Sequence, residues 1–110
     1  MSNLDLPVVY DGAIDPSDRQ SYKAIGASPA GTEFVYLLSN STGGLLYVGI
    51  TWNPFVRWTY HATKKPWWPE VSHARVLQCD DDRHARRVET WVIHNLVPAH
   101  NIHQKRRVAA

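Results

Sequence analysis

The chain of 110 residues contains one cysteine, Cys79, which limits the sites that it can form. A single thiol cannot close an internal disulfide, so we expect a protein of the reducing cytoplasm. It also argues against a structural zinc site built from several cysteines. The histidines near the C-terminus match no common zinc spacing either: His94, His100 and His103.

Long apolar segments are also missing. No run of about 18 apolar residues is present, so the sequence predicts no membrane-spanning helix. Residues 1–7 lack the basic stretch followed by an apolar stretch that marks a secretory signal. There is no internal repeat, and the length suits one domain with a single core.

The net charge is low, at +2, but the charges are unevenly divided. Residues 1–33 carry five acids and two bases, a balance of −3, whereas residues 34–110 carry ten bases and five acids, a balance of +5. A phosphate-binding surface requires a basic face, but many small domains are mildly basic. Charge alone therefore leaves nucleic-acid binding as one option among several.

The clearest pattern lies in residues 34–61. Two runs rich in aromatic and branched residues, 34–38 and 45–50, are separated by a polar, glycine-containing turn, which predicts a β-hairpin. Asn53 suits a helix N-cap and Pro54 the first helical position, so a helix is expected directly after the hairpin.

That helix is expected to run from Pro54 to about residue 63. One stripe is apolar and should face the core; it contains Phe55, Trp58 and Ala62. Arg57 and His61 lie one turn apart on a neighbouring stripe, so we expect both side chains at the rim of the core.

Residues 64–69 interleave lysines, tryptophans and prolines, and the prolines preclude a long helix. Lys64, Lys65 and Trp67 suit a loop that contacts phosphate and stacks on a base. A tryptophan that closes the end of the core is an equally good interpretation. Residues 71–79 then predict a third strand.

A second helix is expected over residues 82–96, ending before Pro98. The run 80–82 of three aspartates favours an N-cap and matching first-turn charges over a metal site. Glu89 projects on the apolar side of this helix, where an acid needs a partner such as Arg57 or a bound cation. That apolar side contains Ala85, Val88, Val92, Ile93 and Leu96.

The ordered set of Tyr36, Tyr47, Gly49, Arg57 and His61 resembles the GIY-YIG nuclease superfamily. Residues 34–36 stand at the first triplet, with Phe34 in place of glycine. Residues 47–49 stand at the second triplet, with Val48 in place of isoleucine, and ten residues separate the two triplets.

The resemblance covers residues 34–101 and implies an α/β fold: a three-stranded antiparallel sheet flanked by helices, in the order β-β-α-(α)-β-α. Residues 1–33 would be an extension with an edge strand and a short helix, and residues 102–110 a basic tail. The implied activity is metal-dependent hydrolysis of phosphodiester bonds in DNA, with Mg²⁺ or Mn²⁺ bound by Glu89. The implied catalytic residues are Tyr36, Tyr47, Arg57, His61, Glu89 and Asn101.

Candidate nucleic-acid contacts outside this set are Lys64, Lys65, Trp67, Lys105, Arg106 and Arg107. Since 33 extra residues are few for a recognition domain, we expect low specificity, or specificity from a homodimer or a separate recognition partner. Two other classes stay open at this point. One is a nucleic-acid-binding module without cleavage, and the other is a protein-interaction domain with an exposed patch of Trp52, Trp67 and Trp68.

Overall fold

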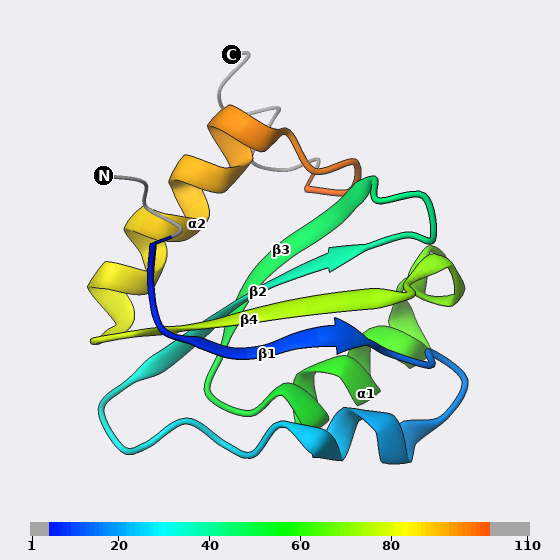
Figure 1. The fold of residues 1–110 in the computed structure, drawn as a ribbon, viewed down its shortest axis with the longest axis horizontal. Helices are drawn as coiled ribbons and strands as arrows, with labels where there is room; N and C mark the ends of the chain where they lie inside the picture. Colours follow the sequence, from blue (N-terminus) through cyan, green and yellow to red (C-terminus); the bar gives the residue numbers. More distant parts are fainter. Residues whose placement is uncertain (1–4, 102–110) are drawn as a thin grey trace.

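The computed structural model describes residues 5–101 and is built around a four-stranded antiparallel sheet in the order β1-β4-β2-β3 (Figure 1). The antiparallel sheet flanked by helices is as predicted, but it has four strands rather than three, because β1, from residues 1–33, pairs with β4 and forms one edge. This strand carries Asp and Gly between its apolar residues, and the open edge of β4 selects its conformation. The strands are β1 (Val8–Ala13), β2 (Glu33–Ser39), β3 (Leu45–Thr51) and β4 (His73–Cys79).

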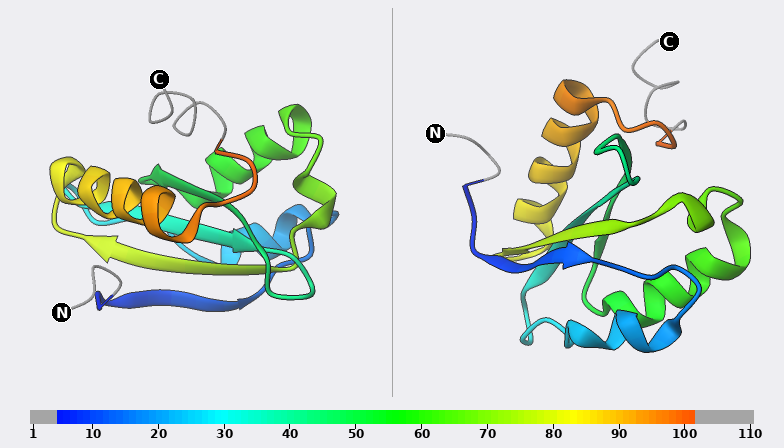
Figure 2. Two further views of the ribbon diagram at one scale, coloured as in Figure 1. Left: turned by 90° about the horizontal axis from the view of Figure 1, so that it is seen from above. Right: turned by 45° about the vertical axis from the view of Figure 1, so that its right-hand side comes forward.

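Both faces of the sheet are covered, so the molecule has three layers (Figure 2). On one face lie α1 (Pro54–Lys64), the 3-10 helix η1 (Arg19–Ala24) and the short turn η2 (Trp68–Glu70). On the other face lies α2 (Asp82–Leu96). Successive residues of β2 alternate between the two cores, which explains why this central strand is buried along nearly all its length.

Local capping sets where both α-helices begin. The side chain of Asn53 accepts a hydrogen bond from the Val56 amide and precedes Pro54 at the first helical turn. The side chain of Asp81 accepts a hydrogen bond from the His84 amide at 2.8 Å. The capping interpretation of the aspartate run is therefore confirmed, and the predicted span of α2 matches the observed one.

The N-terminal segment, which we expected to be an extension of the domain, contributes side chains to the core. Tyr22 on η1 is fully buried, and its hydroxyl accepts a hydrogen bond from Trp68 Nε1 at 2.8 Å. Ile14 and Ile25 are buried in the same cluster. The rings of Tyr22 and Trp58 meet edge to face, so η1 packs against α1 on this face of the sheet.

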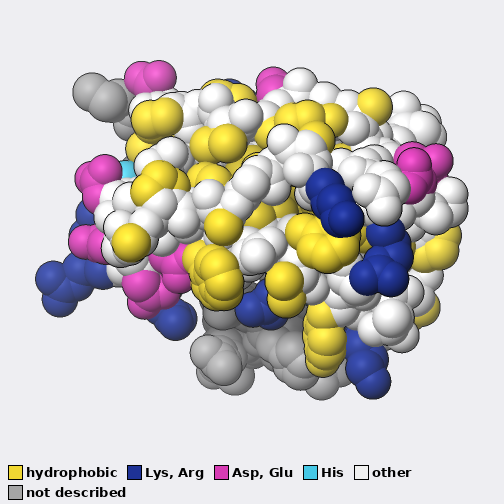
Figure 3. Space-filling view, turned by 90° about the horizontal axis from the view of Figure 1, so that it is seen from below, with side chains coloured by type: hydrophobic (Ala, Val, Ile, Leu, Met, Phe, Trp, Pro, Cys, Tyr) yellow, Lys and Arg dark blue, Asp and Glu magenta, His cyan; other side chains and the backbone are white. Residues whose placement is uncertain are grey.

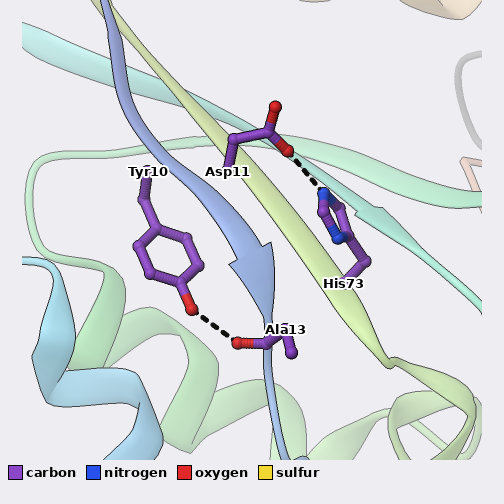
Figure 4. A network of polar contacts seen from close by, with 4 residues as sticks. All are labelled: Tyr10, Asp11, Ala13 and His73. Carbon is purple, nitrogen blue, oxygen red and sulfur yellow. Dashed lines mark hydrogen bonds and ion pairs between the residues drawn. The ribbon is translucent and has the colours of Figure 1, made fainter.

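Polar contacts also fasten β1 to the rest of the sheet (Figure 4). Asp11 on β1 pairs with His73 on β4 at 2.6 Å. Within β1 itself, the Tyr10 hydroxyl donates a hydrogen bond to the Ala13 carbonyl. Within residues 5–101, no helix has the length and apolarity needed to cross a membrane.

Candidate active site

A cavity of about 370 Å³ lies beside the edge strand β3, where helices from both faces of the sheet reach it. Four of the side chains proposed from the sequence line this cavity, and each comes from a different element. They are Tyr36 from β2, Tyr47 from β3, Arg57 from α1 and Glu89 from α2. Residues separated by up to 53 positions are therefore brought to one place.

Gly49 allows Tyr36 to lie flat against β3. The two residues are directly paired across the β2–β3 ladder. A Cβ atom at position 49 would lie only 2.4 Å from the Tyr36 hydroxyl oxygen. The glycine of the second triplet is required here because no side chain fits under the Tyr36 ring.

His61 lies behind Tyr36 rather than at the rim, where we expected it. Its side chain is 2% exposed, and its Nε2 atom lies 2.7 Å from the Tyr36 hydroxyl. Burial, with help from the positive charges of Arg57 and Lys65, lowers the pKa of His61 from 6.5 to about 4. His61 is therefore neutral at physiological pH, and Nδ1 has no partner within the part of the chain that the structure describes.

Both tyrosines of the site are protonated at neutral pH. Burial raises the pKa of Tyr36 well above 10, and Tyr47 adds to this effect while Arg57 opposes it. Burial also raises the pKa of Tyr47, followed by the negative charge of Glu89. A phenol with a raised pKa does not act as a free phenolate, so proton transfer at Tyr36 needs the neighbouring imidazole.

Glu89 has no ion-pair partner among residues 5–101. A salt bridge between Glu89 and Arg57, the structural alternative that the sequence left open, is not formed. Burial raises the pKa of Glu89, while Arg86 acts in the opposite direction. A half-buried carboxylate that faces a polar cavity without a partner fits a divalent cation.

The surroundings of Glu89 do not form a closed metal cage. In the described part of the chain, no group of three or more His, Cys, Asp or Glu side chains is arranged to hold a metal ion. A cation at Glu89 would therefore keep several water ligands, as Mg²⁺ usually does.

Asn101 lies outside the cavity and holds the backbone of β3. Its side-chain amide donates to the Val48 carbonyl at 3.0 Å and accepts from the Val48 amide at 3.1 Å. Val48 lies between Tyr47 and Gly49, so these bonds fix the strand segment that carries the second triplet. Asn101 thus positions the site without contacting the cavity.

An aromatic column supports Tyr47 from behind. Trp67 stacks on Tyr47, with ring centroids 5.0 Å apart, and on His100 at 5.4 Å. Trp67 and Trp68 are only 6% and 2% exposed. The core-closing interpretation of this segment is therefore correct, and Trp67 does not offer a free face to a base.

The other residues that the sequence suggested as nucleic-acid contacts differ in how exposed they are. Lys64 is exposed at the end of α1, and Lys65 is partly buried beside it. Lys105, Arg106 and Arg107 lie outside the described residues. Of the three tryptophans expected in an interaction patch, only Trp52 is exposed, at 59%.

Other residues of the cavity were not predicted as site residues from the sequence. Glu33 directly precedes the first triplet, and no periodic pattern marks it. Trp52 precedes the helix cap, and the sequence suggested it only as part of an interaction patch. Asp82 and Arg86 pair at 2.8 Å, four residues apart on α2, a spacing that could have indicated this pair.

Basic side chains also lie outside the cavity, on the face formed by η1 and α1 (Figure 3). Arg19 and Lys23 of η1 lie over the Phe55 ring, with their charged groups 5.7 and 5.3 Å from its centroid. The acidic N-terminal third thus contributes positive charge beside α1.

Comparison with protein-family models identifies the GIY-YIG catalytic domain over residues 32–95, which is more than half of the chain. The matched region begins just before β2 and ends near the last turn of α2, so it includes Tyr36, Tyr47, Arg57 and Glu89. No match was found among curated proteins or among solved structures. The match to the domain model and the geometry around Gly49 lead to one conclusion: the chain belongs to the GIY-YIG catalytic domain family.

Proposed function

We propose that this protein is a divalent-metal-dependent endonuclease that hydrolyses phosphodiester bonds in DNA. Members of the GIY-YIG family are nucleases and generally depend on divalent metal ions. The observation that carries the proposal is the convergence of Tyr36, Tyr47, Arg57 and Glu89 on one cavity. A guanidinium can bind the phosphate, an unpaired carboxylate can hold a metal ion, and a pair of phenols can orient the attacking water.

Arg57 and Glu89 would bind the reacting phosphate from two sides of the cavity. Arg57 is exposed, lines the cavity and has no carboxylate within 4 Å in residues 5–101, so its guanidinium fork is free to bind phosphate oxygens. Glu89 would hold Mg²⁺ or Mn²⁺. When bound there, the cation would supply positive charge for the phosphate and the departing oxygen.

Tyr36 and His61 would form a proton relay. The attacking water transfers a proton to the Tyr36 oxygen while the phenolic proton of Tyr36 passes to His61 Nε2, 2.7 Å away. This step requires the tautomer of His61 that carries its proton on Nδ1. The relay removes the need for a free phenolate, which the raised pKa of Tyr36 disfavours. Tyr47, held by Trp67, would orient the water.

The binding-module alternative was suggested by Phe34, which replaces the glycine of the first triplet. Phe34 is 3% exposed and packs in the core beneath the sheet. It does not line the cavity, so the replacement leaves the site open. Phe34 therefore gives no reason to prefer binding without cleavage.

Cleavage of labelled DNA with Mg²⁺, Mn²⁺ or EDTA tests the proposal when wild type is compared with Glu89→Gln. The amide keeps the shape of the side chain but cannot replace the carboxylate as a metal ligand. We expect metal-dependent cleavage by wild type and a loss of at least about 100-fold in the variant. DNA affinity and thermal melting should change little, because no ion pair is removed.

Glu70→Gln is the matched control, since Glu70 is exposed and lies outside the cavity. It should cleave like wild type. A Glu89→Gln protein with wild-type cleavage would refute the role of Glu89. Wild-type protein that binds DNA but cleaves none with either metal would support the binding module instead.

A further inference from the structure

A second hollow, of about 340 Å³, adjoins the active-site cavity. The two share three residues, Glu33, Trp52 and Asp82. The loop of residues 28–32 forms the opposite wall of the second hollow. The Ser28 amide donates a hydrogen bond to the Trp52 carbonyl at 2.7 Å, which holds this loop against the end of β3.

Trp52 stands at the boundary between the two hollows, and its indole is 59% exposed. By contrast, Trp58, Trp67 and Trp68 are all buried. A large aromatic ring left in solvent beside a phosphate site provides a flat surface on which a nucleobase can stack.

The charged side chains that line the second hollow are carboxylates, and none is basic. Its charged residues are Glu33 and Asp82, so a phosphate would be repelled from it. Asp82 is paired with Arg86, but the Oε2 atom of Glu33 is buried and has no hydrogen-bond partner within the described chain. A ligand that places N–H donors against the partly buried Glu33 carboxylate would offset the cost of its burial.

We infer that the second hollow is a nucleobase subsite in which an unpaired base stacks on Trp52 and donates hydrogen bonds to Glu33. This inference rests on the proposed function, because the base belongs to the nucleotide next to the phosphate at Arg57. Guanine fits best, since its adjacent N1–H and N2–H groups give two donors to one carboxylate. In a duplex these donors are engaged in pairing, so the subsite selects single-stranded or locally unpaired DNA.

Trp52→Ala tests the stacking surface. Affinity is measured in EDTA, and cleavage with Mg²⁺, for one labelled oligonucleotide used single-stranded or annealed to its complement. We expect the variant to lose about 5- to 100-fold in affinity and cleavage on the single strand and to change little on the duplex. Trp52→Phe should retain most of the preference, because it keeps a stacking ring.

Tyr60→Ala is the matched control. Tyr60 is 53% exposed, close to the 59% of Trp52, but lines neither hollow. It should leave the ratio of single-strand to duplex affinity unchanged. An equal effect of Trp52→Ala on both DNAs, or the same loss in Tyr60→Ala, would overturn the subsite.

Glu33→Gln tests base recognition without knowledge of the cleavage position. The ligands are a poly-dT oligonucleotide with one central guanine and its counterpart with inosine, which lacks the N2 amino group. We expect wild type to bind the guanine oligonucleotide about 5- to 20-fold more tightly and Glu33→Gln to reduce that ratio towards one. Equal wild-type affinities for the two oligonucleotides would overturn recognition by Glu33.

These measurements separate the subsite from the proposed function. Wild type that binds single strands through Trp52 but cleaves nothing supports the subsite and refutes the nuclease. Wild type that cleaves DNA with no effect of Trp52→Ala supports the nuclease and refutes the subsite.

Discussion

At the scale of single residues, the site depends on close packing around one tyrosine. Tyr36 is 1% exposed, lies against Gly49 and is hydrogen-bonded to His61. Tyr36 is still among the residues that line the cavity. A buried phenol with a fixed neighbour on each side has its position set to within a fraction of an ångström, as proton transfer requires.

Gly49→Ala should displace the Tyr36 ring. The new Cβ would clash with the ring and hydroxyl of Tyr36, so we expect a loss of about 1–3 kcal/mol in the free energy of unfolding. Cleavage should fall further than stability, because the hydrogen bond to His61 is disturbed. Urea denaturation measures the first effect. Gly26→Ala, where a Cβ would meet nothing within 4 Å, is the control and should be nearly neutral.

His61 should make stability fall on acidification. The unfolded side chain has a pKa near 6.5 and the folded one about 4, so between these values the unfolded chain binds a proton that the folded protein excludes. Stability present above pH 6.5 is therefore lost as the pH falls to about 4, by up to about 3 kcal/mol.

Urea unfolding of wild type and His61→Gln across this range measures the loss. The difference between the two proteins isolates His61 from carboxyl groups that titrate nearby. The control is a substitution of an exposed histidine: His94→Gln should show the same change of unfolding free energy with pH as wild type. Parallel pH profiles for wild type and His61→Gln would show that His61 does not cause the loss.

At the scale of elements, α1 serves both the core and the cavity. Trp58 and His61 face inward, Arg57 reaches the cavity, and Ala62, which we expected in the core, is exposed. The buried face of α1 includes His61 rather than Ala62, because η1 and Trp68 complete the packing around Trp58. The N-terminal segment thus determines which stripe of α1 is buried.

Removing residues 1–30 should therefore abolish folding rather than leave an active domain. The deletion exposes the β4 edge and removes Tyr22, which touches both Trp58 and Trp68. Tyr22→Ala alone should cost about 3–5 kcal/mol, measured by urea denaturation. Tyr22→Phe keeps the ring and should cost only about 1 kcal/mol. A folded, active deletion variant would show that the segment is dispensable.

At the scale of the whole molecule, the net charge is small but the positive and negative side chains are unevenly distributed over the surface. Arg57, Lys64 and Lys65 lie on or beside α1, and Arg19 and Lys23 lie over Phe55 on the adjoining η1. Glu33 and Asp82, the acids of the second hollow, also line the active-site cavity together with Arg57. A DNA strand could place its phosphates on these basic side chains and one nucleobase in the second hollow.

DNA affinity should fall steeply as salt concentration rises. Each neutralised phosphate contributes about −0.7 to −0.9 to the slope of log affinity against log salt. Replacing Lys64 and Lys65 by Ala should make the slope less negative by about 1.4 to 1.8. Replacing Arg83 and Arg87, exposed on α2, should leave it nearly unchanged. A slope of zero for wild type would remove DNA from the candidate partners.

The sequence by itself determined the local elements and the family motif. The hairpin, the start of α1 at Asn53 and the whole of α2 follow from periodicity, turns and capping, which act over a few residues. The order of Tyr36, Tyr47, Gly49 and Arg57 was enough to indicate the fold family. Only the tertiary structure decided the burial of His61, the stacking of Trp67, the pairing of β1 and the exposure of Trp52. These features depend on which distant surfaces meet, and local propensity carries no information about that choice.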